Sequence, residues 1–258
     1  MGLQRRTSTS GEDVTSSSTG QPFLGRPGIA LAAVAAALAL VVACQKAPTP
    51  TPTPTPIAAE AILLQAGVEM GRLSSFHFLL EHSQGGVVLP GGLVITTASG
   101  DVARPDKLRA TLEGTVLGSF LRVNLVVVGD ATYMTNPLTN AWQSFPLAVS
   151  PVAFFKPDEG IHALLGRVQG PRRLGDEVVG GRPAHHLEGT LPSDALAPLV
   201  GAALPGQSVT VGLWIDQERS LLLRAELVGR LLAEDSPGVK RTITLSAFNS
   251  PVDITAPQ

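Results

Sequence analysis

The sequence predicts an α+β domain built on one wide, curved antiparallel sheet of about ten strands, with a few helices covering its concave side. Two observations predict this class. From Phe76 onward, short stretches alternate apolar and polar residues with period two, which is typical of strands with one buried face. Three other segments have apolar residues at helical spacing or begin with residues that start helices.

The first half of the domain is expected to be one helix followed by a meander of strands. Residues 58–73 have helical spacing, and two serines end the helix. Residues 101–106 are expected to form a turn around Pro105. The strands of this half are predicted at 76–81, 93–97, 108–114, 120–128 and 131–135.

The second half is expected to mix short helices with longer strands. Residues 151–155 form a short apolar turn, residues 161–168 a helix, and Ser193 caps a further helix that ends at Val200. Strands are predicted at 172–179, 184–189, 208–215, 221–228 and 240–248. A sheet this wide must curl, and three short helices hardly fill its concave side, which leaves room for a ligand cavity.

The N-terminal 43 residues are interpreted as a signal peptide. Residues 29–43 form an apolar run without a charge, and this run is shorter than the ~20 residues that span a bilayer. The run ends in Val41-Val42-Ala43-Cys44, which resembles the lipobox of bacterial lipoproteins. In that motif the cysteine is lipidated and becomes the new N-terminus. The alternative is a short transmembrane anchor with a chance cysteine.

The remaining chain is divided into a stalk and one domain. Residues 44–56 comprise the expected lipidated Cys44 and a Pro/Thr repeat, whose alternating prolines favour an extended backbone that cannot pack a core. Residues 57–258 are expected to form a single domain. The protein is therefore predicted to be held on the extracytoplasmic face of the cell membrane by the lipid on Cys44.

Composition excludes several function classes. The net charge is −2 and aromatic residues make up 4% of the chain, so neither a basic surface nor a base-stacking platform for nucleic acid is expected. The single cysteine allows no internal disulfide and no multi-cysteine metal site. We expect a monomer.

No pattern of catalytic residues is present in the sequence, and an enzyme is not expected. The adjacent His185 and His186 point to opposite faces of a predicted strand and make a poor chelating pair. No nucleophile elbow or phosphate-binding loop occurs. Asp216 is interpreted as a turn residue. We therefore expect no catalytic residue, no metal and no cofactor.

Four long segments carry a resemblance to a known family. GDVARPDKLRATLEG, VVGDATYMTNPLTNAW, GLWIDQERSLLLRAELVG and RTITLSAFNSPVDI look like the mycobacterial and related LppX/LprAFG lipoproteins, over roughly residues 60–254. The resemblance implies a half-barrel sheet with helices across its open side, similar to LolA and LolB, around a hydrophobic cavity. It further implies binding and transfer of lipids or glycolipids through the cell envelope, in some members alongside a membrane exporter.

The side chains on the apolar faces of the predicted strands are candidates for lining such a cavity. The alternative is that the same side chains simply pack a closed core. Three functions therefore stay open: a lipid or glycolipid carrier, a lipoprotein-sorting carrier or assembly factor, and a structural or sensing module without a ligand. The candidate lining residues are Phe76, Phe78, Leu121, Val123, Leu125, Val209, Val211 and Leu213.

Overall fold

The computed structural model describes residues 58–258, apart from 90, 147–149, 157–159, 201–202 and 237. The expected signal peptide, Cys44 and the stalk lie outside the described residues. Residues Thr55–Gln258 group into one compact unit. Its helices are α1 (Ala59–Gly71), the 3₁₀ helix η1 (Pro151–Phe155), α2 (Ile161–Leu165) and α3 (Ser193–Val200). Its strands are β1 (Ser75–His82), β2 (Val87–Leu89), β3 (Leu93–Ala103), β4 (Lys107–Val116), β5 (Ser119–Val128), β6 (Ala131–Thr135), β7 (Trp142–Ser144), β8 (Gln169–Val179), β9 (Arg182–Pro192), β10 (Ser208–Asp216), β11 (Leu222–Val228) and β12 (Lys240–Ser246).

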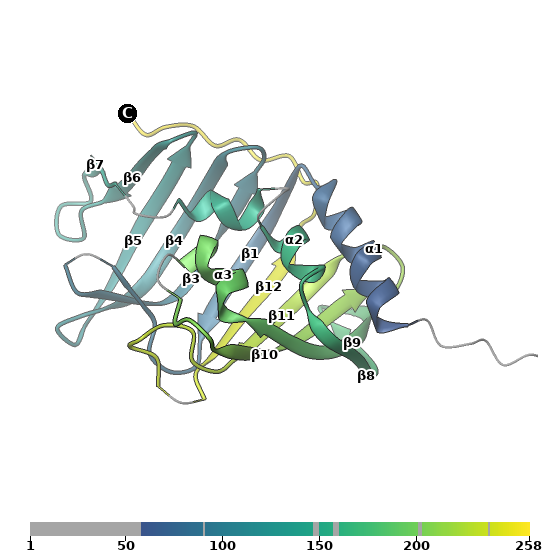
Figure 1. Cartoon of the computed structure of the whole chain (residues 1–258). Coiled ribbons are helices and arrows are strands. Elements are labelled where there is room, and N and C mark those ends of the chain that lie inside the picture. Colours follow the sequence, from purple (N-terminus) through teal and green to yellow (C-terminus); the bar gives the residue numbers. More distant parts are fainter. Residues whose placement is uncertain (1–57, 90, 147–149, 157–159, 201–202, 237) are drawn as a thin grey trace, which may run out of the picture. The chain divides into compact units, whose positions relative to one another are not determined.

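The twelve described strands form one antiparallel sheet that is not closed into a barrel. Their order is β7-β6-β5-β4-β3-β1-β12-β11-β10-β9-β8, with β2 paired to β3. Figure 1 shows the helices on one side of this curved layer. The predicted fold class is confirmed. The strand count exceeds ten because β2 and β7 have three residues each, which is too short for an alternating pattern to be recognised.

The buried face of the sheet follows from the strand register. Residues that oppose one another on paired strands share a face, so a row of buried residues marks the inner side. One such row crosses six neighbouring strands from β6 to β12 and contains only apolar residues and glycine. Its members are Met134, Leu125, Ala110, Gly100, Phe78 and Leu245.

Strand β3 is longer than predicted, and this corrects the expected turn at 101–106. The strand continues through Gly100 and Asp101 to Ala103, so the turn is confined to 104–106. Gly100 is required by close approach, because a Cβ there would lie 2.1 Å from the carbonyl oxygen of Arg109. A Gly-Asp pair that locally favours a turn therefore sits in mid-strand, where tertiary contacts override the local preference.

The helices are joined to one another and to the sheet by specific contacts. His162 Nδ1 of α2 lies 2.7 Å from the Gly67 carbonyl oxygen of α1, to which it donates a hydrogen bond. The missing side chain of Gly67 allows this approach, since a Cβ would lie 3.3 Å from the His162 carbonyl oxygen. At the C-terminal end of α1, Arg104 Nη1 donates to the Gly71 carbonyl oxygen at 2.6 Å. These bonds fix where α1 and α2 lie above the sheet.

Candidate functional site

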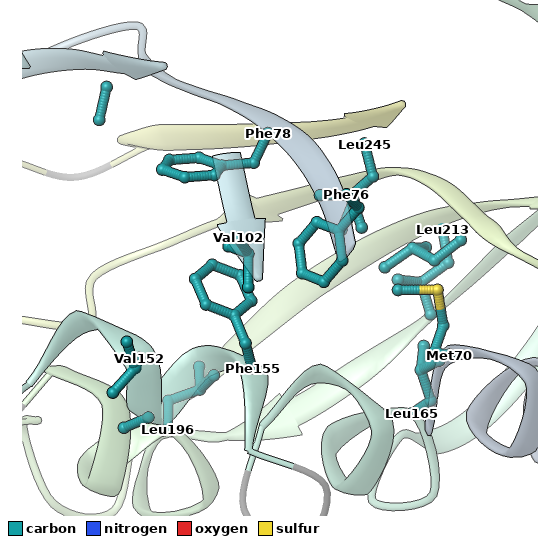
Figure 2. Packing of buried hydrophobic residues seen from close by; sticks show 14 of the residues in the cluster. Met70, Phe76, Phe78, Val102, Val152, Phe155, Leu165, Leu196, Leu213 and Leu245 are labelled. Atoms are coloured by element: carbon teal, nitrogen blue, oxygen red, sulfur yellow. The ribbon is translucent and has the colours of Figure 1, made fainter. Parts of the chain in front are cut away.

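The centre of the interior is an aromatic cluster between η1 and the sheet. Phe155 of η1 packs on Phe76 and Phe78 of β1, with ring centroids 5.0 and 5.7 Å apart. Figure 2 shows Phe155 pointing from η1 toward the sheet, next to Val102. All four side chains are buried. This cluster fills the middle of the concave face.

An apolar cavity of about 70 Å³ lies beside this cluster, between the helical layer and strands β9–β12. It is small compared with the roughly 300–1,000 Å³ of typical ligand pockets. All the residues that line it are apolar. They are Phe154, Ile161, Leu164, Leu165, Val168, Leu191, Leu196, Val211, Leu213, Leu222, Ala225, Leu227 and Ile243.

The eight residues proposed from the sequence all belong to the core cluster, with Leu121 at its partly buried margin. The structure brings Val211 and Leu213 to the cavity. It places Phe76 and Phe78 in the aromatic cluster. The other four do not line the cavity: Val209 is buried on β10, while Leu121, Val123 and Leu125 lie on β5, four strands away from β12. Their role as ligand contacts stays a prediction.

Sequence reasoning missed the covering side of the cavity. Phe154, Ile161 and Leu164 line it from η1 and α2. The sequence predicts a short apolar turn at residues 151–155, within a partly helical region, and these residues are not among the expected lining residues. The signal was its two adjacent phenylalanines, because a short surface turn seldom carries two large aromatic side chains.

The apolar inner face ends abruptly at a buried polar group. One row of opposing residues runs from Val211 and Leu227, which line the cavity, to Arg241 and His82. Arg241 is buried and pairs with the carboxylate of Asp235. Within the described part of the chain, Arg241 Nη1 and both ring nitrogens of His82 have no hydrogen-bond partner. Desolvation, aided by the nearby guanidinium of Arg241, lowers the pKa of His82 below its ordinary value of 6.5.

Asp235 also stabilises the loop that follows β11. Its second carboxylate oxygen accepts hydrogen bonds from the backbone N–H groups of Leu231 and Leu232 at 2.8 and 2.7 Å. Burial alone would raise the pKa of Asp235, but these two bonds and the Arg241 guanidinium outweigh burial and lower it. Through Asp235, Arg241 therefore links the inner face of the sheet to the loop that follows β11.

A serine, a histidine and an aspartate meet on the outer face of the sheet. His77 Nδ1 lies 2.8 Å from Asp101 Oδ1, and His77 Nε2 lies 3.2 Å from Ser99 Oγ. No sequence motif predicts this contact, because the residues lie on two different strands, β1 and β3, that pair only in the fold. Acyl transfer would also need free N–H donors for an oxyanion, and Ser99 lies between two paired strands whose ladders engage the backbone. We interpret the group as a polar surface network.

Asp101 is the centre of that network. Burial raises the pKa of its carboxyl group, but hydrogen bonds from His77 and Arg109 outweigh this effect and lower the pKa below its ordinary value. Arg109 Nη2 lies 3.0 Å from Asp101 Oδ2. The carboxylate is thus held ionised by two partners.

The other candidate chemical groups have structural roles. His185 bonds to Asp176 and His186 to Glu177, so the two rings do not converge on one site. Asp216 Oδ1 accepts the N–H groups of Glu218 and Arg219 at 2.9 and 2.7 Å, which confirms the turn interpretation. Over the described residues, no group of three or more His, Cys, Asp or Glu side chains is placed to hold a metal ion. Likewise, no helix of the described residues is long and apolar enough to cross a membrane.

Comparisons with known proteins define the class. The LppX_LprAFG lipoprotein family matches residues 58–254, so this chain belongs to that family of lipid-binding envelope lipoproteins. The resemblance stated from the sequence is thereby confirmed. The chain matches no curated protein sequence.

Two solved structures share its fold. The structure of LprF from Mycobacterium bovis is 20% identical, with a TM-score of 0.62 over 77% of this chain and 96% of that one. Lipoprotein LppX from Mycobacterium tuberculosis is 23% identical, with a TM-score of 0.56 over 76% and 98%. A LolA superfamily protein from Nitrosomonas europaea is 13% identical, with a TM-score of 0.27 over 75% and 93%.

Proposed function

We propose that this protein binds the acyl chains of a lipid or glycolipid between its concave sheet face and the layer formed by η1, α2 and α3. The observation that carries the proposal is the continuous apolar lining of the cavity, to which both layers contribute. Apolar burial of a chain in such a site is worth ~25 cal/mol per Å². Membership of a lipid-binding family supports the same function.

The cavity must enlarge for this function, because about 70 Å³ holds only a few methylene groups. The covering elements η1 and α2 have five residues each, and their side chains form much of the lining. We therefore propose that acyl chains enter as η1 and α2 move away from the sheet, and that Phe154 and Leu164 then contact the ligand.

We further propose that lipid on Cys44 anchors the protein to the membrane and that the bound lipid is passed on through the envelope. A membrane exporter is the partner that the family resemblance implies. The lipid on Cys44 is then the anchor and not the ligand.

Filling the cavity tests lipid binding. Ala225 lines the cavity from β11, so Ala225→Leu should occupy most of the free volume and lower uptake of a fluorescent fatty-acid probe by about tenfold. Thermal stability should be kept or raised, because the change fills a void. The matched control is Ala141→Leu at an exposed position, which should leave uptake unchanged.

The measurement uses the compact unit Thr55–Gln258, which contains the whole described core. Lipid extraction and mass spectrometry of the purified unit complement the probe. A unit that neither retains nor accepts acyl chains would contradict the proposal. The small cavity would then favour the module without a ligand, with a core closed by its own side chains.

A further inference from the structure

The turn between β4 and β5 has an exposed leucine where the backbone favours asparagine or glycine. Val116 opposes Ser119, so Leu117 and Gly118 form a two-residue hairpin loop. Their φ angles are +48° and +81°, which corresponds to a type I′ turn. Leucine is disfavoured at positive φ, and the Leu117 side chain is fully exposed at 101%. Neither the turn nor the core explains this residue.

Two further exposed apolar side chains lie at the same end of the sheet. Phe120 of β5 is 63% exposed and Val88 of β2 is 50% exposed. The register places Val88, Val94, Thr115 and Phe120 in one row across four strands, about 14 Å wide. We call Val88, Leu117 and Phe120 the apolar tip.

The two segments that form the apolar tip carry no charge, and the nearest charges on the same face, Glu113 and Arg122, form an ion pair with each other. No charged residue occurs between Glu113 and Arg122, nor between His82 and Asp101. Both segments that form the tip are therefore free of the charges that would oppose entry into an apolar phase. The tip protrudes from a hairpin and is small, whereas a stable protein interface buries about 800 Å² on each partner. This combination favours a lipid surface over a protein partner.

We propose that the apolar tip inserts into the interface of a lipid bilayer and docks the folded unit on the membrane. Residues 45–57 reach at most about 45 Å between Cys44 and α1, so a lipid on Cys44 would keep the unit within about that distance of the membrane. Docking is independent of ligand binding in the cavity. It places the end of the sheet that carries β2 and the β4–β5 hairpin against the lipid.

Vesicle binding of the unit Thr55–Gln258 tests this inference. We expect cosedimentation with phosphatidylcholine vesicles that changes little with salt, because the tip has no charge. Leu117→Asn should lower the partition coefficient about tenfold, and Leu117→Asn combined with Phe120→Ser about a hundredfold. The control Leu174→Asn removes another exposed leucine, which is 48% exposed on β8 at the opposite edge of the sheet, and should leave binding unchanged.

Leu117→Asn also separates docking from folding. It creates the Asn-Gly sequence that type I′ turns prefer, so the melting temperature should rise by about 2–4 °C while vesicle binding falls. A second readout is Phe120→Trp, whose emission should shift to shorter wavelength when vesicles are added. Equal vesicle binding by the unaltered unit and the double variant would overturn the proposal, as would no binding by the unaltered unit. Uptake of the fatty-acid probe should be unchanged in the double variant. This result would show that ligand binding in the cavity does not depend on the apolar tip.

Discussion

The surroundings of His82 disfavour a charged imidazole. Its ring nitrogens are buried without a described partner, and Arg241 lies opposite it on β12. The carboxylate of Asp235 is nearby but is occupied by Arg241 and two backbone N–H groups. The folded protein therefore holds His82 neutral at a pH where the unfolded chain binds a proton.

This predicts that stability falls as the pH drops below about 6.5. The pKa of His82 is lowered on folding, so below its ordinary value of 6.5 the unfolded state binds more protons, and protonation then favours unfolding. The slope contributed by one such group is at most about 1.4 kcal/mol per pH unit. Urea unfolding of the unit between pH 7.5 and 5.5 measures this effect.

Two variants test whether His82 is responsible. His82→Leu should flatten the slope, because it removes the titrating group and two buried nitrogens. The matched control is His185→Gln on β9, which removes a different histidine and leaves His82 and its surroundings intact, so the contribution of His82 to the slope should remain. A slope that survives His82→Leu would assign the pH dependence to other groups.

At the scale of elements, α2 packs closely on α1 where His162 meets Gly67 and Gly71. His162 donates to the Gly67 carbonyl, and neither Gly67 nor Gly71 has a side chain to keep the histidine away. Since α2 supplies Ile161, Leu164 and Leu165 to the cavity lining, this contact controls how firmly the cavity is covered.

Gly67→Val should therefore loosen the cover. The added side chain would meet the backbone of His162, where even a Cβ lies only 3.3 Å from the carbonyl oxygen, and we expect a loss of about 1–3 kcal/mol in stability. Uptake of the fatty-acid probe should become faster, and amide exchange in α2 should increase. Gly166→Ala is the control, because its Cβ would meet only the Ala163 carbonyl oxygen at 3.6 Å. Slower uptake by Gly67→Val would mean that α2 does not gate the cavity.

On the scale of the whole molecule, an open sheet has edges that must not pair with other sheets. The edge strand β8 has Pro171, two register shifts against β9, and the charged Arg172 and Arg173. Such features interrupt a flat row of backbone donors and acceptors. These features are consistent with the monomer expected from the sequence.

Smoothing this edge should promote association. With Pro171→Val, Arg172→Val and Gly175→Val combined, we expect the mass in sedimentation equilibrium to increase with concentration, while the unaltered unit stays monomeric. Arg122→Val removes an arginine from the interior strand β5 and should leave the mass unchanged. A dimer formed by the unaltered unit would show that β8 does not protect the edge.

Most strands could be predicted because one face of each is buried, which imposes an alternating sequence. What could not be predicted depended on contacts between distant segments. Gly100 and Asp101 have the local character of a turn and become strand only through Phe78 and Arg109. The cavity was expected to be large, but Phe154 and Phe155 fill much of the concave side, and the sequence does not show where a five-residue helix will lie.

The pairing of β1 with β12 places the first and last strands of the unit together in the middle of the sheet. A topology with such high contact order folds slowly, because its central contact closes a loop of most of the unit. If the chain is exported as proposed, its N-terminal strands leave the cytoplasm before their C-terminal partner. The core then stays unformed until β12 has also been translocated, so the strand order itself delays folding to the compartment where the protein works.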